Sequence, residues 1–117
     1  MLPNRMQLSR QTEEQLKKLK IYIGITPNVI ARLAFFRSVE SNFRYNPASD
    51  TKKLDGTLVL DKITWLGDTL KPTELILIML YPEMDNKQLL KAWAAHVEDG
   101  IASIRNCKSL VHFTKII

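Results

Sequence analysis

The chain has 117 residues, of which 45% are hydrophobic and 25% charged, and it contains one cysteine. This length and composition predict a single globular domain and exclude a large multidomain enzyme, a disulfide framework and a zinc site built on repeated cysteines. The formal net charge of +5 favours a polyanionic partner.

No apolar run approaches the ~20 residues that span a bilayer. The first residues also lack the apolar core of a signal sequence. We therefore expect a cytoplasmic protein with no membrane partner.

The N-terminal residues predict a short strand followed by a capped helix. Residues 5–9 alternate polar and apolar side chains, which would turn Met6 and Leu8 toward the core. Thr12 and Gln15 have the spacing of a capping box, so a helix is expected over residues 12–23. Its expected buried stripe is Leu16, Leu19 and Ile23. Glu13 with Lys17 and Glu14 with Lys18 are expected to form i,i+4 ion pairs, and Gly24 is expected to end the helix.

A second helix is expected to follow at once, because Thr26 is a good N-cap and Pro27 is tolerated in a first helical turn. It should run to about residue 44 and end before the Asn46-Pro47 turn. The residues expected on its buried face are Val29, Leu33, Phe36 and Phe43, with Ile30 and Ala34 widening the stripe.

Three further elements are expected. Residues 57–60 and 63–66 resemble a hairpin around Asp61 and Lys62. Pro72 opens a helix through the apolar run 75–80, and Asp85 or Asn86 caps a last long helix. The buried stripe expected on that last helix is Leu89, Leu90, Trp93, Val97, Ile101 and Ile104.

The predicted fold is mainly α: a compact helical domain with a short N-terminal strand and a small β-hairpin. One domain is expected over residues 1–117. It comprises a basic strand-helix-helix part over 1–45 and a part with the hairpin and the remaining helices over 54–117.

No pattern predicts catalysis, a metal site or a cofactor. The carboxylates of Asp55, Asp61 and Asp68 could hold Mg²⁺, but each aspartate lies where a turn is expected, so we interpret them as turn residues. Cys107 could carry sulfur as a persulfide, but a lone cysteine is more often a packing residue. It could act as a nucleophile with His96 and His112 only if the fold brought the three side chains together. The glycines are isolated, so no phosphate-binding loop is predicted. We therefore expect a protein that is not an enzyme.

The charge excess lies in the first half of the chain. Residues 1–53 hold ten Lys and Arg against four Asp and Glu, a balance of +6, and the remainder holds seven against eight, a balance of −1. Lys17 and Lys20 share one flank of the first helix and can reach the same stretch of DNA backbone, although such residues can equally form a solvated face partly neutralised by Glu13 and Glu14. The candidate DNA-binding residues are Lys17, Lys18, Lys20, Arg5, Arg10, Arg32 and Arg37.

Two segments carry a resemblance to known families. Residues 7–16 and 24–32 give a strand end, a capped helix, a glycine break and a second helix, which resembles the ribbon-helix-helix pattern of small DNA-binding proteins. More closely, the stretch from Leu8-Ser9 to Ser38, the Leu54-Asp55-Gly56 segment and the helical end resemble the DNA sulfur modification protein family DndE. That likeness covers most of the chain, and residues 7–41 are its best segment.

The DndE resemblance implies a non-catalytic subunit of the Dnd system, which replaces a non-bridging phosphate oxygen of DNA with sulfur. In that family the sulfur comes from a cysteine desulfurase, and the ATP-dependent chemistry belongs to other subunits. The resemblance implies binding to double-stranded DNA with a preference for nicked duplex, association with other Dnd subunits, and a homotetramer.

Two alternatives stay open. One is a sequence-specific regulator of the ribbon-helix-helix type, although those proteins usually end soon after their second helix. The other is an assembly scaffold whose basic face meets an acidic protein. Self-association is expected on separate grounds, because Ile21 and Ile25 lie off the first helix's buried stripe and the run 75–80 offers apolar side chains in every direction.

Overall fold

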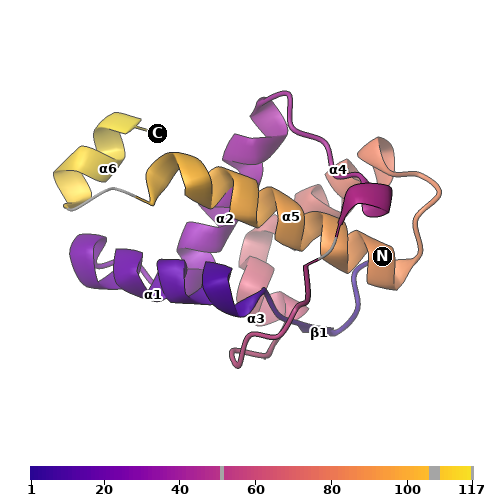
Figure 1. The fold of residues 1–117 in the computed structure, drawn as a ribbon, viewed down its shortest axis with the longest axis horizontal. Coiled ribbons are helices and arrows are strands. Elements are labelled where there is room, and N and C mark those ends of the chain that lie inside the picture. Colours follow the sequence, from indigo (N-terminus) through magenta and orange to yellow (C-terminus); the bar gives the residue numbers. More distant parts are fainter. Residues whose placement is uncertain (51, 106–108, 117) are drawn as a thin grey trace.

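The structure is a computed structural model that describes residues 1–50, 52–105 and 109–116 (Figure 1). Its elements in chain order are β1 (Arg5–Met6), α1 (Arg10–Ile23), α2 (Pro27–Glu40), the 3-10 turn η1 (Pro47–Ser49), β2 (Leu60–Asp61), α3 (Lys62–Leu66), the 3-10 turn η2 (Gly67–Thr69), α4 (Leu70–Leu80), α5 (Asn86–Ile104) and α6 (Leu110–Ile116). The predicted mainly α fold with a short N-terminal strand is confirmed. Within the described ranges no single helix could cross a bilayer, and α1 and α2 reach the necessary length only together, across a bend of 108°.

The helix α5 lies at the centre of the packing, with α1 beside it and α2 crossing it (Figure 1). Asp85 caps α5 through a capping box in which Gln88 N donates to Asp85 Oδ1 and Asp85 N donates to Gln88 Oε1. The predicted stripe is confirmed: Leu89, Trp93, Val97, Ile101 and Ile104 are buried, and Leu90 is half-buried. The predicted face of α1 is confirmed too, since Leu16, Leu19 and Ile23 are buried and Gly24 ends the helix with φ 74°.

The start of α1 was predicted two residues too late. Ser9 is the N-cap, because its Oγ accepts a hydrogen bond from Thr12 N at 3.3 Å. Thr12 lies inside the helix and is buried. Two hydroxyl residues three apart both suit a cap, and the buried position of Thr12 decides between them.

The predicted buried face of α2 is confirmed only in part: Ile30 and Ala34, expected to widen it, are buried, but its expected centre is not. The buried residues are Ile30, Ala31, Ala34, Phe35 and Ser38, whereas Leu33 is exposed. A stripe of small side chains faces α5 because the two backbones nearly touch: a Cβ on Gly100 would lie 1.9 Å from the carbonyl oxygen of Ala34. The centre of the buried face therefore lies about 100° around the helix, or one residue, from the side that hydrophobic size indicated.

The helix α2 also ends earlier than predicted, at Glu40 rather than near residue 44. Both the backbone N–H and the hydroxyl of Ser41 donate to the carbonyl oxygen of Ser38, at 3.0 and 2.6 Å. These bonds replace the next helical turn. Phe43, expected inside the helix, lies in the following segment and is half-buried.

The predicted hairpin around Asp61 and Lys62 does not form. β2 instead pairs antiparallel with β1, with Arg5 opposite Asp61 and Met6 opposite Leu60. Asp61 then caps α3, since its Oδ1 accepts from Thr64 N at 2.7 Å. An aspartate three residues before a threonine amide is thus a helix start here rather than a turn tip.

The N-terminal segment is fastened to the helices by buried hydrogen bonds. Met6 and Leu8 are buried, as predicted, although the strand covers only two residues. The Trp65 indole N–H donates to the carbonyl oxygen of Met6 at 2.8 Å, and Leu2 N donates to Glu74 Oε2 at 2.9 Å. These contacts tie the segment before α1 to α3 and α4.

Candidate nucleic-acid interface

The three lysines of α1 lie on the outer surface of that helix. Lys17, Lys18 and Lys20 are exposed, while the neighbouring Leu16 and Leu19 are buried. Figure 1 shows α1 along one edge of the molecule. The ammonium groups of the three lysines are therefore open to solvent.

Glu13, which the sequence placed on the same charged face, turns into the protein instead. Its carboxylate accepts hydrogen bonds from the N–H groups of Leu58 and Thr57 and from the Thr57 hydroxyl, and the residue is only 4% exposed. Burial raises the pKa of Glu13, but the bonds from Leu58 and Thr57 outweigh burial and hold the pKa below its ordinary value. Lys17 Nζ lies 3.8 Å from Glu13 Oε2, so the predicted pair forms at the edge of this buried site.

Two of the predicted arginines are exposed near the start of α1. Arg5 is on β1, and Arg10 begins α1. The backbone N–H of Arg10 donates to Asp55 Oδ1 at 2.8 Å, which leaves the guanidinium on the surface. Arg10 and Lys17 are seven residues apart, so they project from the same side of the helix.

The other two predicted arginines tie α2 to its neighbours. Arg32 Nε donates to the carbonyl oxygen of Trp65 at 2.8 Å, and Arg32 Nη2 donates to that of Thr64 at 3.2 Å. Arg37 Nε donates to Ser103 Oγ at 2.6 Å. Both side chains are half-buried, so the structure separates them from the open cations of α1.

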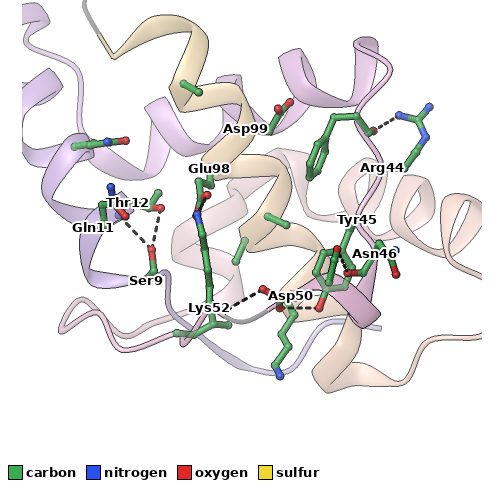
Figure 2. A pocket seen from close by; sticks show the side chains of 18 of the residues that line it. Ser9, Gln11, Thr12, Arg44, Tyr45, Asn46, Asp50, Lys52, Glu98 and Asp99 are labelled. Carbon is green, nitrogen blue, oxygen red and sulfur yellow. Dashed lines mark hydrogen bonds and ion pairs between the residues drawn. The ribbon is translucent and has the colours of Figure 1, made fainter.

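A groove of about 440 Å³ runs along α5 (Figure 2). The start of α1, with Ser9, Gln11 and Thr12, forms one side, and the segment after α2, with Arg44 and Tyr45, forms the other. The Tyr45 hydroxyl donates to Asp50 Oδ2 at 2.9 Å, and burial together with that carboxylate raises the pKa of Tyr45 to about 12. Tyr45 therefore stays a protonated hydrogen-bond donor at neutral pH.

Behind this groove lies a buried hydrogen-bonded chain centred on His96. Ser38 Oγ donates to Asp99 Oδ2 at 2.8 Å and lies 2.9 Å from His96 Nδ1, and Tyr81 Oη lies 2.7 Å from His96 Nε2. Because the single hydroxyl proton of Ser38 goes to the carboxylate, Nδ1 must carry a proton and donate to Ser38. Nε2 then accepts from Tyr81, whose oxygen accepts from Tyr45 N at 2.7 Å.

The other groups considered for chemistry are placed as follows. Asp55 and Asp61 accept backbone N–H bonds, as expected of turn and cap residues, and Asp68 is exposed in η2. Across the described ranges, no three His, Cys, Asp or Glu side chains gather as metal ligands would. His96 is buried and His112 is exposed on α6, whereas Cys107 lies outside the described residues.

Comparisons with known proteins identify the family. The family model described as DNA sulphur modification protein DndE matches residues 5–112. The chain belongs to this family. A comparison with curated proteins finds no match.

Two solved structures of the DndE family are similar to this chain. The crystal structure of DndE from Escherichia coli B7A, involved in DNA phosphorothioation modification, is 78% identical with a TM-score of 0.87, and the match covers 88% of this chain and 99% of that one. A glycine-to-lysine mutant of DndE, involved in DNA phosphorothioation, is 76% identical with a TM-score of 0.84 over 89% of this chain and 99% of that one. DndE membership places the chain in the DNA phosphorothioation system, as the resemblance implied.

Sequence reasoning missed the groove, the inward turn of Glu13 and the His96 chain. The groove is assembled from three separate segments, and Glu13 meets partners 44 and 45 residues further along the chain. No local periodicity reports such contacts. The one available signal was His96 beside the buried stripe of α5, since a buried histidine requires hydrogen-bond partners.

Proposed function

We propose that this DndE chain is the non-catalytic DNA-binding subunit of the phosphorothioation machinery, and that it binds duplex DNA, preferring nicked duplex, through the basic face of α1. One observation carries the proposal: Lys17, Lys18 and Lys20 are exposed together while Glu13 is buried. Of the two carboxylates that could neutralise this face, Glu13 is buried and still pairs with Lys17, and Glu14 remains at the surface. The three exposed lysines therefore outnumber the single exposed carboxylate and present a positive face to phosphates.

The buried chain at His96 supports a non-catalytic role rather than a hydrolytic one. Ser38, His96 and Asp99 bring together a hydroxyl, an imidazole and a carboxylate, but Ser38 is 1% exposed and His96 is fully buried. The carboxylate accepts from the serine rather than from the imidazole. A nucleophile needs an open approach and a base that its orienting carboxylate holds in place, and neither is present in this arrangement.

One contact weakens the alternative of a ribbon-helix-helix regulator. Such a reader points strand side chains at base edges. Gln7 instead donates from Nε2 to the carbonyl oxygens of Leu54 and Gly56, at 2.6 and 3.1 Å, and β1 pairs with β2 of its own chain. These contacts favour backbone binding with little sequence preference, whose affinity falls with salt by a log-log slope of about −0.9 per phosphate neutralised.

The test exchanges two cations for anions without disturbing the Glu13 site. Lys18→Glu with Lys20→Glu should weaken binding to nicked duplex at least about tenfold, because two phosphate contacts become repulsions. The matched control, Lys71→Glu with Lys87→Glu, makes the same charge change at exposed positions on α4 and α5. Fluorescence anisotropy with nicked, intact and single-stranded DNA of one sequence measures both variants.

Equal loss in the two variants would show that net charge alone governs binding, and the assignment to α1 would then be wrong. If the α1 variant folds and binds like the parent, the assignment is likewise wrong. Affinity that differs more than about a thousandfold between unrelated duplex sequences would favour the regulator instead. Strong salt-dependent capture of an acidic protein with no DNA binding would favour the scaffold.

The proposal includes self-association, as a homotetramer, and association with the other Dnd subunits. Ile21, Leu75 and Met79 are 80%, 60% and 72% exposed, which is unusual for large apolar side chains of an isolated globule. Closed symmetric assemblies bury such side chains, and they also repeat the basic face of α1 on every copy.

A further inference from the structure

The groove along α5 has a feature that the α1 interface does not need. Three carboxylates line it, and each is already engaged within the chain. Asp50 accepts from the Tyr45 hydroxyl and from Lys52 N, Glu98 pairs with Lys52 Nζ, and Asp99 accepts from Ser38 Oγ. Figure 2 shows Asp50, Lys52, Glu98 and Asp99 around the opening.

Three of the four cations that line the same groove are not paired in this way. Lys91 and Arg105 line it and are exposed, and neither has an ion pair with any carboxylate in the part of the chain that the structure describes. Among the residues that the structure describes, Arg44 donates to the carbonyl oxygens of Ser41 and Phe43 and has no ion pair with a carboxylate. With Lys52 paired to Glu98, these three cations face two remaining carboxylates, so the groove lining is net positive and favours an anionic ligand.

The remaining lining fits a flat, polar ring attached to that anion. Phe43 and Tyr45 contribute aromatic side chains, and Ala95 and Ala102 of α5 leave room beside them. Gln11 and Gln15, four residues apart on α1, line the same groove and so come from one side of that helix. Side-chain amides donate and accept, so they can pair with the edge of a base, and aromatic rings stack with bases of any sequence.

We propose that the groove holds one unpaired nucleotide of a DNA strand end, with its phosphate toward Arg44, Lys91 and Arg105. This rests on the proposed DNA-binding function and extends it, because a nick is where a nucleotide leaves the duplex at least cost: its backbone is continuous on one side only. A volume of about 440 Å³ lies in the range of sites for ligands of this size. The groove is therefore the element that distinguishes nicked from intact duplex.

Two variants test the groove in different ways. Lys91→Gln with Arg105→Gln removes its charge, and Ala102→Trp fills it while keeping every charge. All three positions are exposed, so folding should survive, and thermal unfolding checks this. The matched control is Lys71→Gln with Lys87→Gln, which removes the same charge away from the groove lining.

The parent and variants are measured against intact duplex and against a nicked duplex that carries one unpaired thymidine nucleotide at the nick. Both groove variants should lose about tenfold in affinity for the nicked duplex and keep their affinity for intact duplex, because stacking and phosphate contacts are lost only where the nucleotide enters. The control should keep the parent's ratio of nicked to intact affinity. An unchanged ratio in both groove variants overturns the proposal and leaves the α1 assignment standing.

A titration of the isotope-labelled protein with thymidine 5′-monophosphate locates the ligand by backbone amide shifts. We expect shifts at Gln11, Gln15 and Ala95 that disappear in Ala102→Trp. Shifts with the nucleotide but no effect of the variants on nicked duplex would identify a free-nucleotide site and overturn the strand-end assignment. Shifts with a short glutamate peptide instead of the nucleotide would show that an acidic protein segment occupies the groove, which also overturns it. If the parent binds no DNA at all, the proposed function itself fails.

Discussion

The imidazole of His96 is enclosed by Ser38, Tyr81 and the ring of Phe43, whose centroid lies 5.1 Å from that of His96. Burial lowers the pKa of His96 to about 4, and the charge of Arg44 acts in the same direction, while Asp99 opposes them. Protonation would also force a second N–H against the Tyr81 hydroxyl, which already donates to that nitrogen. The folded protein therefore keeps His96 neutral.

This depressed pKa makes stability depend on pH in one direction. Between the ordinary pKa of 6.5 and about 4, the unfolded chain binds a proton at His96 that the folded chain does not, so stability falls as the solution is acidified through this window. We expect a loss of about 2 kcal/mol between pH 7 and pH 5. Urea unfolding at the two pH values measures it, and His96→Gln, which does not titrate, should lack this component. An equal pH dependence in parent and variant would assign the loss to other groups.

Glu13 makes stability depend on pH in the same direction as His96, because its pKa is lowered and its hydrogen bonds need the carboxylate. Its contribution is present above the unfolded pKa and is lost as the pH falls through the folded one. Glu13→Gln should cost about 2 kcal/mol at neutral pH, since Thr57 N–H and Leu58 N–H donate to different carboxylate oxygens and the amide keeps only one oxygen, so one buried N–H group loses its acceptor. Glu14→Gln, on the exposed side of the same helix, is the control and should change the free energy of unfolding by no more than about 0.5 kcal/mol.

At the level of elements, the crossing of α2 and α5 leaves no room for a side chain at Gly100. A Cβ there would lie 1.9 Å from the carbonyl oxygen of Ala34. Gly100→Ala should therefore cost at least about 3 kcal/mol, because two packed helices must separate. Gly24→Ala is the comparison: it has open space but a φ of 74°, so strain alone should cost about 1 kcal/mol. Similar losses for the two variants in denaturant melts would contradict the close crossing.

The elements that the sequence predicted well are those decided by local chemistry. The cap at Asp85, the left-handed Gly24 and the apolar faces of α1 and α5 depend on residues within a few positions of one another. The errors arise where distant segments decide. The buried face of α2 is centred on small residues because Gly100 lets α5 approach Ala34, and Asp61 caps a helix because β1 takes Leu60 as its partner.

In the candidate site too, local spacing predicts some features, and contacts between distant segments decide the others. Exposure of Lys17, Lys18 and Lys20 follows from their place beside the buried stripe of α1 and was predictable from spacing. The contacts that engage Arg32 and Arg37 come from α3 and from Ser103 on α5, which no spacing within α2 reports. Charge counts alone therefore overstated the number of open cations.

At the scale of the whole molecule, exposed apolar side chains gather on two separate helices. Ile21 and Tyr22 lie on α1, and Leu75, Ile78 and Met79 lie on α4, all of them at least 41% exposed. Spacings of three and four residues put the three α4 side chains on one side of that helix. A tetramer with two kinds of two-fold interface needs two different patches on each chain, whereas one patch gives only a dimer.

We therefore expect the parent to sediment as a tetramer and each patch, when broken, to leave a dimer. Leu75→Glu with Met79→Glu places charges in the α4 patch, and Ile21→Glu does so in the α1 patch; because these positions are exposed, the folded chain should persist. Combining the changes should give monomers of 13.5 kDa. Sedimentation equilibrium at micromolar concentration distinguishes the three states. A parent that already sediments at 13.5 kDa would contradict the tetramer and would mean that something other than a second copy covers these side chains. In the monomeric variant, the DNA affinity that the tetramer gains by repeating the α1 face should be lost.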